Sequence, residues 1–334
     1  MTYMKKVFFI GLLLISALSA RAQEFSYEAN MESRAALMYN GDDFSYNTQQ
    51  VQTNFYASYG EHLSMRIRTR MYNWSKGANF FDASDYFEFY YSPDENWTFA
   101  AGKGDNRFGS FEYDQRPINF YYLSEFSNNV GAFRWCASAE RQAGNLGRVG
   151  VQVAQSMYAT DLIGYNLYLH RFTDKWSAMW SLSAHEYEKD SYMGMVAIGD
   201  EYNFGKFKLR LDAIDRFVSI DDLADWTVSA RATWVPTDRL QIAFEYAKDV
   251  NNTEFRDAMV AKGSDINQYQ FRAEYYPFKE NRNIRLHACG AIRQGQTAPD
   301  IFSSSTIPVE FSSTSAQVGI SWRIIKLHNR NYLK

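Results

Sequence analysis

The stretch FSYEANMESRAALMY, from Phe25 to Tyr39, decides the fold class because its residues alternate in character. The odd positions are mostly apolar or aromatic, and the even positions from 26 to 34 are polar or charged. Side chains of a β-strand point to opposite faces with a period of two, so this stretch predicts a long strand between an apolar and an aqueous phase. Strands of a soluble sandwich also alternate, but they usually run about five or six residues. Strands of about ten residues fit a tilted crossing of a membrane.

The same alternation recurs along the chain and predicts sixteen strands, an even number as in bacterial single-chain barrels. We therefore expect an all-β fold, a transmembrane antiparallel β-barrel. The outward-facing positions of the other fifteen strands lie within 51–59, 63–71, 87–91, 97–101, 133–137, 149–153, 163–169, 176–182, 196–202, 207–213, 226–234, 240–246, 269–275, 284–292 and 316–322.

The lengths of the connections give an independent indication of a membrane barrel. Connections after even-numbered strands are short, as at 60–62 and 236–239, whereas those after odd-numbered strands are mostly longer, up to 105–129, 249–266 and 294–313. Short periplasmic turns and long outer loops are typical of outer-membrane barrels. This parity predicts that both ends of the barrel domain lie in the periplasm.

Composition excludes several other classes. The chain has 334 residues, of which 22% are charged, and a mean hydropathy of −0.44, which excludes a polytopic helical membrane protein. The net charge of −3 argues against a general nucleic-acid binder. Aromatic residues make up 17% of the chain, more than one core needs, and can form girdles at the two membrane interfaces. We expect outer-membrane lipid as a partner and no nucleic acid.

The first 22 residues have the pattern of a secretory signal peptide. Lys5 and Lys6 precede an apolar run from Val7 to Leu18, and Ala20-Arg21-Ala22 offers a small-x-small cleavage site. A transmembrane anchor would need about 20 apolar residues, and this run is shorter. The sequence thus predicts a signal peptide at 1–22, a single barrel domain at 23–334, and export to the outer membrane of a Gram-negative cell.

Function should reside on the inward face, because sixteen strands enclose a water-filled lumen. Arg66, Arg68 and Arg70, the arginine row, lie on one face of a predicted strand about 7 Å apart. Three neighbouring guanidinium groups repel one another and require an anion, an opposing carboxylate or open water. Two interpretations of this row therefore remain: a path for anions, and ion pairs that stabilise the wall. Pairing with neighbouring strands is the preferred interpretation for most of ten further inward basic positions: Arg34, Arg134, Arg148, Lys208, Arg210, Arg231, Arg272, Arg285, Arg293 and Arg323.

The connection at 105–129 is too aromatic for a solvated loop and needs a surface on which to pack. Its start, AGKGDNRFGSFEYD from Ala101 to Asp114, followed by Pro117-Ile118, resembles the Gly-Lys…Phe-Gly…Glu region of phosphate-selective-type (O/P-like) outer-membrane porins. It is most similar to the porin relatives of Bacteroidota. The motif covers about twenty residues, whereas strand parity and the leader extend the resemblance over nearly the whole chain.

This resemblance implies a usually trimeric barrel whose third loop folds inward to narrow the pore, with arginines lining the path. Arg107, Glu112, Asp114 and Arg116 then become the residues of the constriction loop. Outer-membrane chains commonly end in an aromatic residue, whereas this chain ends in Lys334. We therefore expect the last strand to finish near 322–325 and a tail to follow it.

We therefore expect a passive diffusion porin that favours anions and passes small anionic or polar solutes. A substrate-dedicated sugar or peptide channel and a structural or adhesive barrel remain alternatives. The five histidines are scattered without metal-like spacing, so neither a metal site, a cofactor nor a catalytic function is expected. Cys136 and Cys289 fall on inward positions of distant strands, and their pairing is left open.

Overall fold

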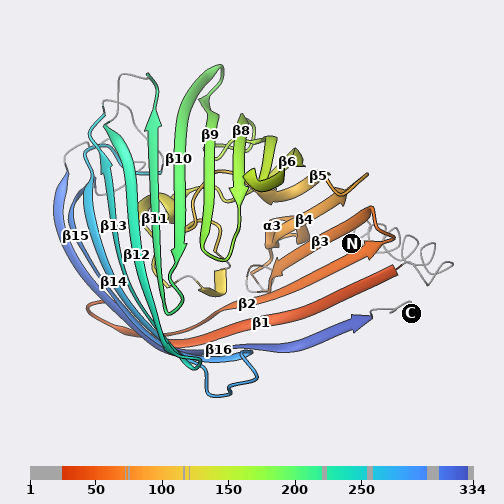
Figure 1. Cartoon of the computed structure of the whole chain (residues 1–334). Helices are drawn as coiled ribbons and strands as arrows, with labels where there is room; N and C mark the ends of the chain where they lie inside the picture. The colour runs from red at the N-terminus through yellow and green to blue at the C-terminus, as the bar shows by residue number, and fades with distance from the viewer. Residues whose placement is uncertain are drawn as a thin grey trace.

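The computed structural model describes residues 25–71, 73, 76–115, 117–119, 121–219, 224–253, 259–298 and 308–329. The predicted signal peptide at 1–22 and Arg116 lie outside these residues. Figure 1 shows the strands curving around a common interior. Their bounds are β1 (Phe25–Tyr39), β2 (Phe44–Tyr59), β3 (Leu63–Arg70), β4 (Ser84–Tyr91), β5 (Trp97–Asp105), β6 (Phe133–Gln142), β7 (Arg148–Gln155), β8 (Ile163–Arg171), β9 (Trp176–Glu188), β10 (Ser191–Asn203), β11 (Phe207–Phe217), β12 (Asp225–Thr237), β13 (Leu240–Asn251), β14 (Asp265–Tyr275), β15 (Ile284–Thr297) and β16 (Val309–Asn329).

The sixteen strands form one closed barrel, which confirms the predicted architecture and strand number. Each strand pairs antiparallel with the next one in sequence, and β1 pairs with β16 to close the ring. This seam runs from Tyr27 opposite Asn329 to Tyr39 opposite Ala316. β16 therefore extends beyond the end expected near 322–325, because its pairing with β1 continues to Asn329.

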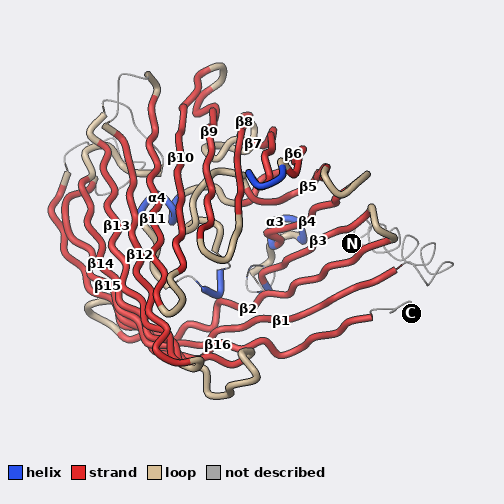
Figure 2. Tube along the Cα trace, viewed as in Figure 1, coloured by secondary structure: helices blue, strands red, loops and turns tan. Residues whose placement is uncertain are grey.

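Helical segments are short and lie in the connections, as Figure 2 shows. α3 (Phe80–Ala83) precedes β4, α4 (Glu125–Asn129) precedes β6, and two 3₁₀ turns cover Pro117–Asn119 and Gly144–Leu146. No helix in the described part of the chain is both long and apolar enough to cross a lipid bilayer.

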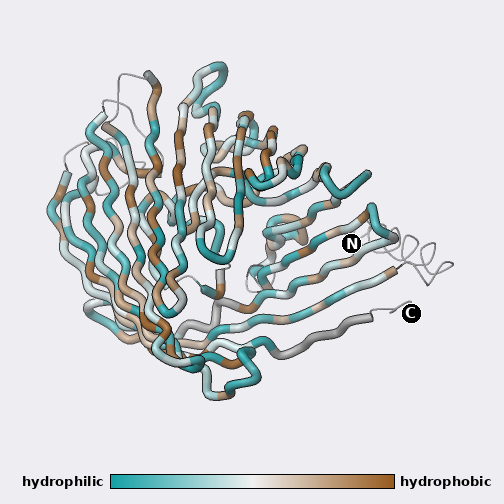
Figure 3. Tube along the Cα trace, in the orientation of Figure 1, coloured by the Kyte–Doolittle hydropathy of each residue, from teal (hydrophilic) through white to brown (hydrophobic). Residues whose placement is uncertain are grey.

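Hydrophobic and hydrophilic residues alternate along many strands, as the colours of Figure 3 show. Many of the apolar side chains are exposed, whereas many of the polar side chains between them are buried. On β11, Leu209 and Leu211 are exposed, whereas Asp212 and Arg216 are buried. The period of two places such residues on opposite sides of the sheet, so the polar face of the closed barrel points to its interior. This outcome confirms the faces predicted for this strand.

An apolar cluster nevertheless occupies part of the interior. Met195 and Ala197 of β10 and Ile214 of β11 lie on the buried face of their strands. Three connections supply the other members, which are Phe108, Phe126, Val130, Met157, Met259 and Val260. We call these nine residues the interior apolar cluster. The lumen on the β10–β11 side is thus filled by side chains from folded connections.

Candidate functional site

The β5–β6 connection, residues 106–132, is held against the buried face of distant strands. The backbone N–H groups of Phe111 and Glu112 donate to the carboxylate of Asp212 on β11, at 2.6 and 3.2 Å. Those of Glu125 and Phe126, in the first turn of α4, donate to the Asp249 carboxylate on β13, at 2.8 and 3.2 Å. Two wall carboxylates therefore bind four backbone donors that would otherwise need water.

Further contacts continue along the same wall toward β15. Arg285 of β15 donates to the carbonyl of Ile118 at 2.8 Å and to Asn119 Oδ1 at 3.0 Å. Tyr121 Oη donates to Glu274 Oε1 of β14 at 2.9 Å. The connection thus spans the strands from β11 to β15 through hydrogen bonds between residues more than ninety positions apart in the sequence.

Glu112, predicted as a constriction residue, organises the connection itself. Its carboxylate is only 1% exposed and accepts hydrogen bonds from Ser124 N, Ser124 Oγ and Ser127 Oγ, each at 2.7 Å. Burial and, second, the charge of Glu245 raise the pKa of Glu112 to about 7, while the serine hydrogen bonds act in the opposite direction. Glu112 therefore joins the start of the connection to the N-terminus of α4.

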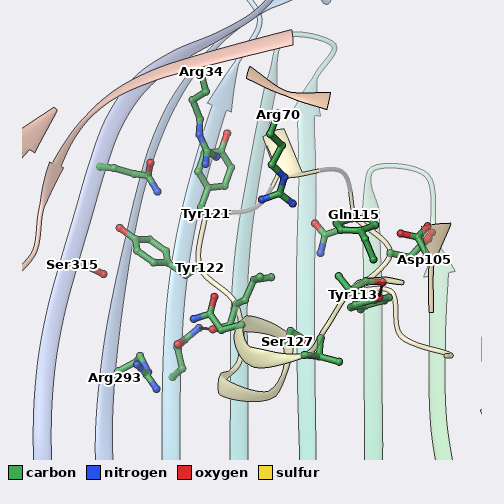
Figure 4. Close-up of a pocket in the computed structure, with 18 of the residues that line it drawn as sticks. Arg34, Arg70, Asp105, Tyr113, Gln115, Tyr121, Tyr122, Ser127, Arg293 and Ser315 are labelled. Atoms are coloured by element: carbon green, nitrogen blue, oxygen red, sulfur yellow. Dashed lines mark hydrogen bonds between the residues drawn. The ribbon is translucent and has the colours of Figure 1, made fainter. Parts of the chain in front are cut away.

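The main cavity inside the barrel has a volume of about 880 Å³ and lies beside this connection (Figure 4). Its walls come from β1, β3–β6 and β14–β16 together with the connection. Two carboxylates, Asp105 and Asp114, line it. They face an excess of guanidinium groups, which belong to Arg34, Arg66, Arg68, Arg70, Arg107 and Arg293.

Two members of the arginine row share a carboxylate that the sequence did not predict as a partner. Arg68 Nε and Arg70 Nε lie 3.0 and 2.9 Å from the carboxylate of Asp85 on β4. The register shifts between Arg68 and Thr69, whose partners are Tyr86 and Ser84, so Asp85 is the extra residue of a bulge. Strict alternation cannot anticipate such a residue, and its charge offsets part of the row.

Arg66 is held differently, by aromatic rings. Its Cζ lies 3.5 Å from the ring centroid of Tyr86 and 5.6 Å from that of Tyr56. No carboxylate within the described ranges forms an ion pair with it. Stacking fixes the guanidinium plane without neutralising its charge, so Arg66 keeps its full positive charge at the cavity wall.

Three residues that line the main cavity also line a smaller one. Arg107 and Asp114 line both the main cavity and a cavity of about 280 Å³, whereas Arg66 lines both the main cavity and one of about 410 Å³. Tyr90 lines both smaller cavities. Asp114 is exposed and interacts electrostatically with Arg107 and Arg66. We call Arg66, Arg107 and Asp114 the junction.

Ion pairs along the wall account for seven of the ten further basic positions. The predicted pairing with a neighbouring strand is found for five of them, whereas Arg272 pairs with Glu274 of its own strand and Arg293 with Glu125 of α4. The pairs are Arg148–Glu140, Arg210–Glu201, Arg231–Glu245, Arg272–Glu274, Arg285–Glu274, Arg293–Glu125 and Arg323–Glu32.

One predicted outward residue, Phe133, faces the cavity instead. Its ring lies 5.0 Å from Cζ of Arg68 and 5.8 Å from Cζ of Arg70, and it lines the main cavity. Phe133 is the first residue of β6, directly after the connection. A strand end next to a folded connection need not follow the alternation of the strand.

The two cysteines lie on β6 and β15 and are free thiols. Neither contributes to the main cavity. In the described ranges, no group of three or more His, Cys, Asp and Glu residues is placed to hold a metal ion.

We compared the chain with protein-family models, curated proteins and solved structures. No protein-family model matches the sequence, and no curated protein does. Three solved structures are similar over 90% of this chain. OmpT of Vibrio cholerae is 11% identical with a TM-score of 0.61 and 98% of its chain covered. An anion-selective porin from Comamonas acidovorans is 12% identical (TM-score 0.62, 99% covered), and the outer-membrane channel DcaP of Acinetobacter baumannii is 10% identical (TM-score 0.63, 98% covered).

The fold is that of the outer-membrane porins. At identities of 10–12% the likeness concerns the barrel architecture, which this chain shares with these structures over 90% of its length. The arrangement of its cavities and of the junction is described from its own residues.

Proposed function

We propose that this protein is an outer-membrane porin, a passive diffusion channel for small hydrophilic solutes that favours anions. One observation carries the proposal: the barrel exposes apolar side chains on its outer face and encloses adjoining cavities lined by arginine inside. An apolar exterior with a polar interior is what a lipid-embedded channel requires. A soluble barrel would gain nothing from the apolar exterior.

The β5–β6 connection serves as the constriction of this channel. Its contacts with Asp212 and Asp249 support an inward fold, and each junction residue lines two cavities. Arg107 and Asp114 fit the predicted role, Glu112 holds the connection together, and Arg66 is the member of the arginine row that belongs to the junction.

Export by residues 1–22 and an orientation with short turns in the periplasm belong to the same proposal. A cysteine introduced by Asp238→Cys, between β12 and β13, should resist membrane-impermeant thiol reagents in intact cells. It should react after the outer membrane is permeabilised. Labelling of this cysteine in intact cells would show that the barrel has the opposite orientation.

A homotrimer is the assembly that the strand lengths favour. β3, β4 and β7 have 8 residues each, fewer than the about 9–11 that a membrane strand needs, so the wall from β3 to β7 is low. Phe81 of α3 packs over Phe87 and Trp135 on the outer face of this low wall. One structure of the same fold, OmpT of Vibrio cholerae, is described in a trimer form. The mass of the protein in detergent tests this assembly: three copies per particle support it, and one copy refutes it.

Planar-bilayer recording tests the channel itself. The purified full chain should insert as steps of stable conductance, and its reversal potential in a salt gradient should indicate preferred passage of chloride over potassium. A folded barrel that gives no conductance would point to the structural or adhesive alternative. A conductance that one sugar or peptide blocks would favour a substrate-dedicated channel.

A further inference from the structure

Two adjoining parts of the proposed pore differ in how their charges are balanced. Six guanidinium groups and two carboxylates line the main cavity, and the ion pairs of Arg68 and Arg70 with Asp85 and of Arg293 with Glu125 reduce its positive excess without removing it. The 280 Å³ cavity next to it carries Arg107 and Arg148 against Asp114 and Glu140, which is an even balance. A solute that crosses from one cavity to the other leaves a region with a positive excess and enters one with as many carboxylates as guanidinium groups.

The main cavity favours solutes with net negative charge. Its positive excess lies within one enclosed space, and protein walls of low dielectric focus the field of fixed charges. Screening over about 8 Å at physiological salt leaves the charges of one cavity wall acting together. Its volume of about 880 Å³ falls in the range of cavities that hold organic molecules, and is far larger than an inorganic ion needs.

The junction imposes a second requirement, because an exposed carboxylate stands among its arginines. Asp114 lines both cavities and interacts with Arg107 and Arg66. The Arg66 guanidinium is stacked on rings rather than bound to a carboxylate, so it can accept a new one. A solute with only negative groups meets repulsion from Asp114, whereas a solute that also carries an ammonium group can pair with it.

We propose that the pore selects solutes that combine net negative charge with an ammonium group, namely acidic amino acids and short acidic peptides. This inference rests on the channel function proposed above. The carboxylates of the solute pair with Arg66 and Arg107 while its ammonium group pairs with Asp114. Asp114 is exposed, and Arg66 and Arg107 are half-buried at cavity walls, so water can replace the solute at each contact and the solute passes without being trapped.

Three probes of similar size separate the requirements. Glutamate has two carboxylates and an ammonium group, glutarate has two carboxylates without it, and glutamine has no net charge. Their fluxes into liposomes that contain the purified full chain are compared at pH 7.5 and low salt. Glutamate should enter about two- to five-fold faster than glutarate and than glutamine, the range that one exposed ion pair supports.

Variants assign each requirement to its residues. D114N should abolish the preference for glutamate over glutarate but retain the preference for glutamate over glutamine. D114E, which keeps the carboxylate, should retain both preferences. R68Q/R70Q in the main cavity should reduce the preference over glutamine. D238N removes a carboxylate from an exposed turn outside the lumen and should change nothing.

The outcomes distinguish this inference from the channel function. If glutarate enters wild-type liposomes as fast as glutamate, or if D114N and D114E behave alike, the inference is wrong although the channel stands. Equal entry of glutamine and glutamate would also refute it. If no solute enters liposomes that contain a correctly folded barrel, the proposed function itself fails.

Discussion

Two sides of one barrel interior contrast sharply in what fills them. Toward β14–β16, β1 and β3–β6 the interior is a cavity of about 880 Å³ that is rich in arginine. Toward β10–β11 it is occupied by the interior apolar cluster, in which Phe126 is fully buried. Both sides are built by strands with the same alternation. The period of two determines which face of a strand points inward, and the connections determine whether water or apolar side chains meet that face.

Deleting residues 108–116 should have the largest effect on this contrast. The deletion removes Phe108 from the interior apolar cluster and the two backbone donors to Asp212. The filled side should open to water, and the single-channel conductance should rise. Recording in planar bilayers measures this. Unchanged conductance in a variant that migrates as a folded barrel would show that the connection does not narrow the pore.

Phe126→Ala should weaken the filled side without shortening the chain. The Phe126 ring packs edge-on against Phe108 with centroids 5.7 Å apart, so its truncation should lower the free energy of unfolding by about 3–5 kcal/mol. Equilibrium unfolding in urea measures the loss. Phe244→Ala is the matched control, because Phe244 is 53% exposed on the outer face and should cost less.

Single substitutions in the arginine row should distinguish the arginine that contacts aromatic rings from the two that share a carboxylate. Arg66→Gln removes a charge held only by rings and should lower the anion-to-cation permeability ratio at low salt. Arg68→Gln should lower the permeability ratio less, because Asp85 then pairs with Arg70 alone. Asp85→Asn should raise the permeability ratio, because it removes a negative charge next to two arginines.

Reversal potentials at 0.05 M and 1 M salt provide the measurement for this series. The differences should shrink at the higher concentration, since the screening length falls to about 3 Å at 1 M. Cation selectivity of the wild-type channel at low salt would overturn the anion preference.

Acidification should have the smallest effect, at one carboxylate. Asp114 is exposed to the cavity but lies deep inside the barrel, where the surrounding protein removes it from bulk water. This desolvation and, second, the charge of Asp105 raise the pKa of Asp114 to about 6, while Arg107, Arg66 and Arg210 act in the opposite direction. A fall from pH 7.5 to 5 therefore protonates Asp114 and removes one negative charge from the junction. The anion-to-cation ratio should rise with a midpoint near pH 6, and D114N should show the higher ratio at both pH values.

Local pattern predicted the barrel well, because alternation is a property of neighbouring residues. The strand count, the inward arginine row and the packing of an aromatic connection could all be anticipated from segments such as 63–71 and 105–129. Asp85 escaped prediction because a bulge breaks the alternation locally. The pairing of Phe111 with Asp212 joins residues 101 positions apart, and no local signal specifies it.

The seam between β1 and β16 has a consequence for biogenesis. The first and last strands are the ones that join, so no part of the chain can complete the ring until synthesis reaches Val309–Asn329. A chain cut within that strand would leave the facing edges of β1 and β15 with backbone groups that lipid cannot satisfy. An unpaired strand edge therefore distinguishes an incomplete barrel from a complete one, and cellular quality control could recognise incomplete molecules by this edge alone.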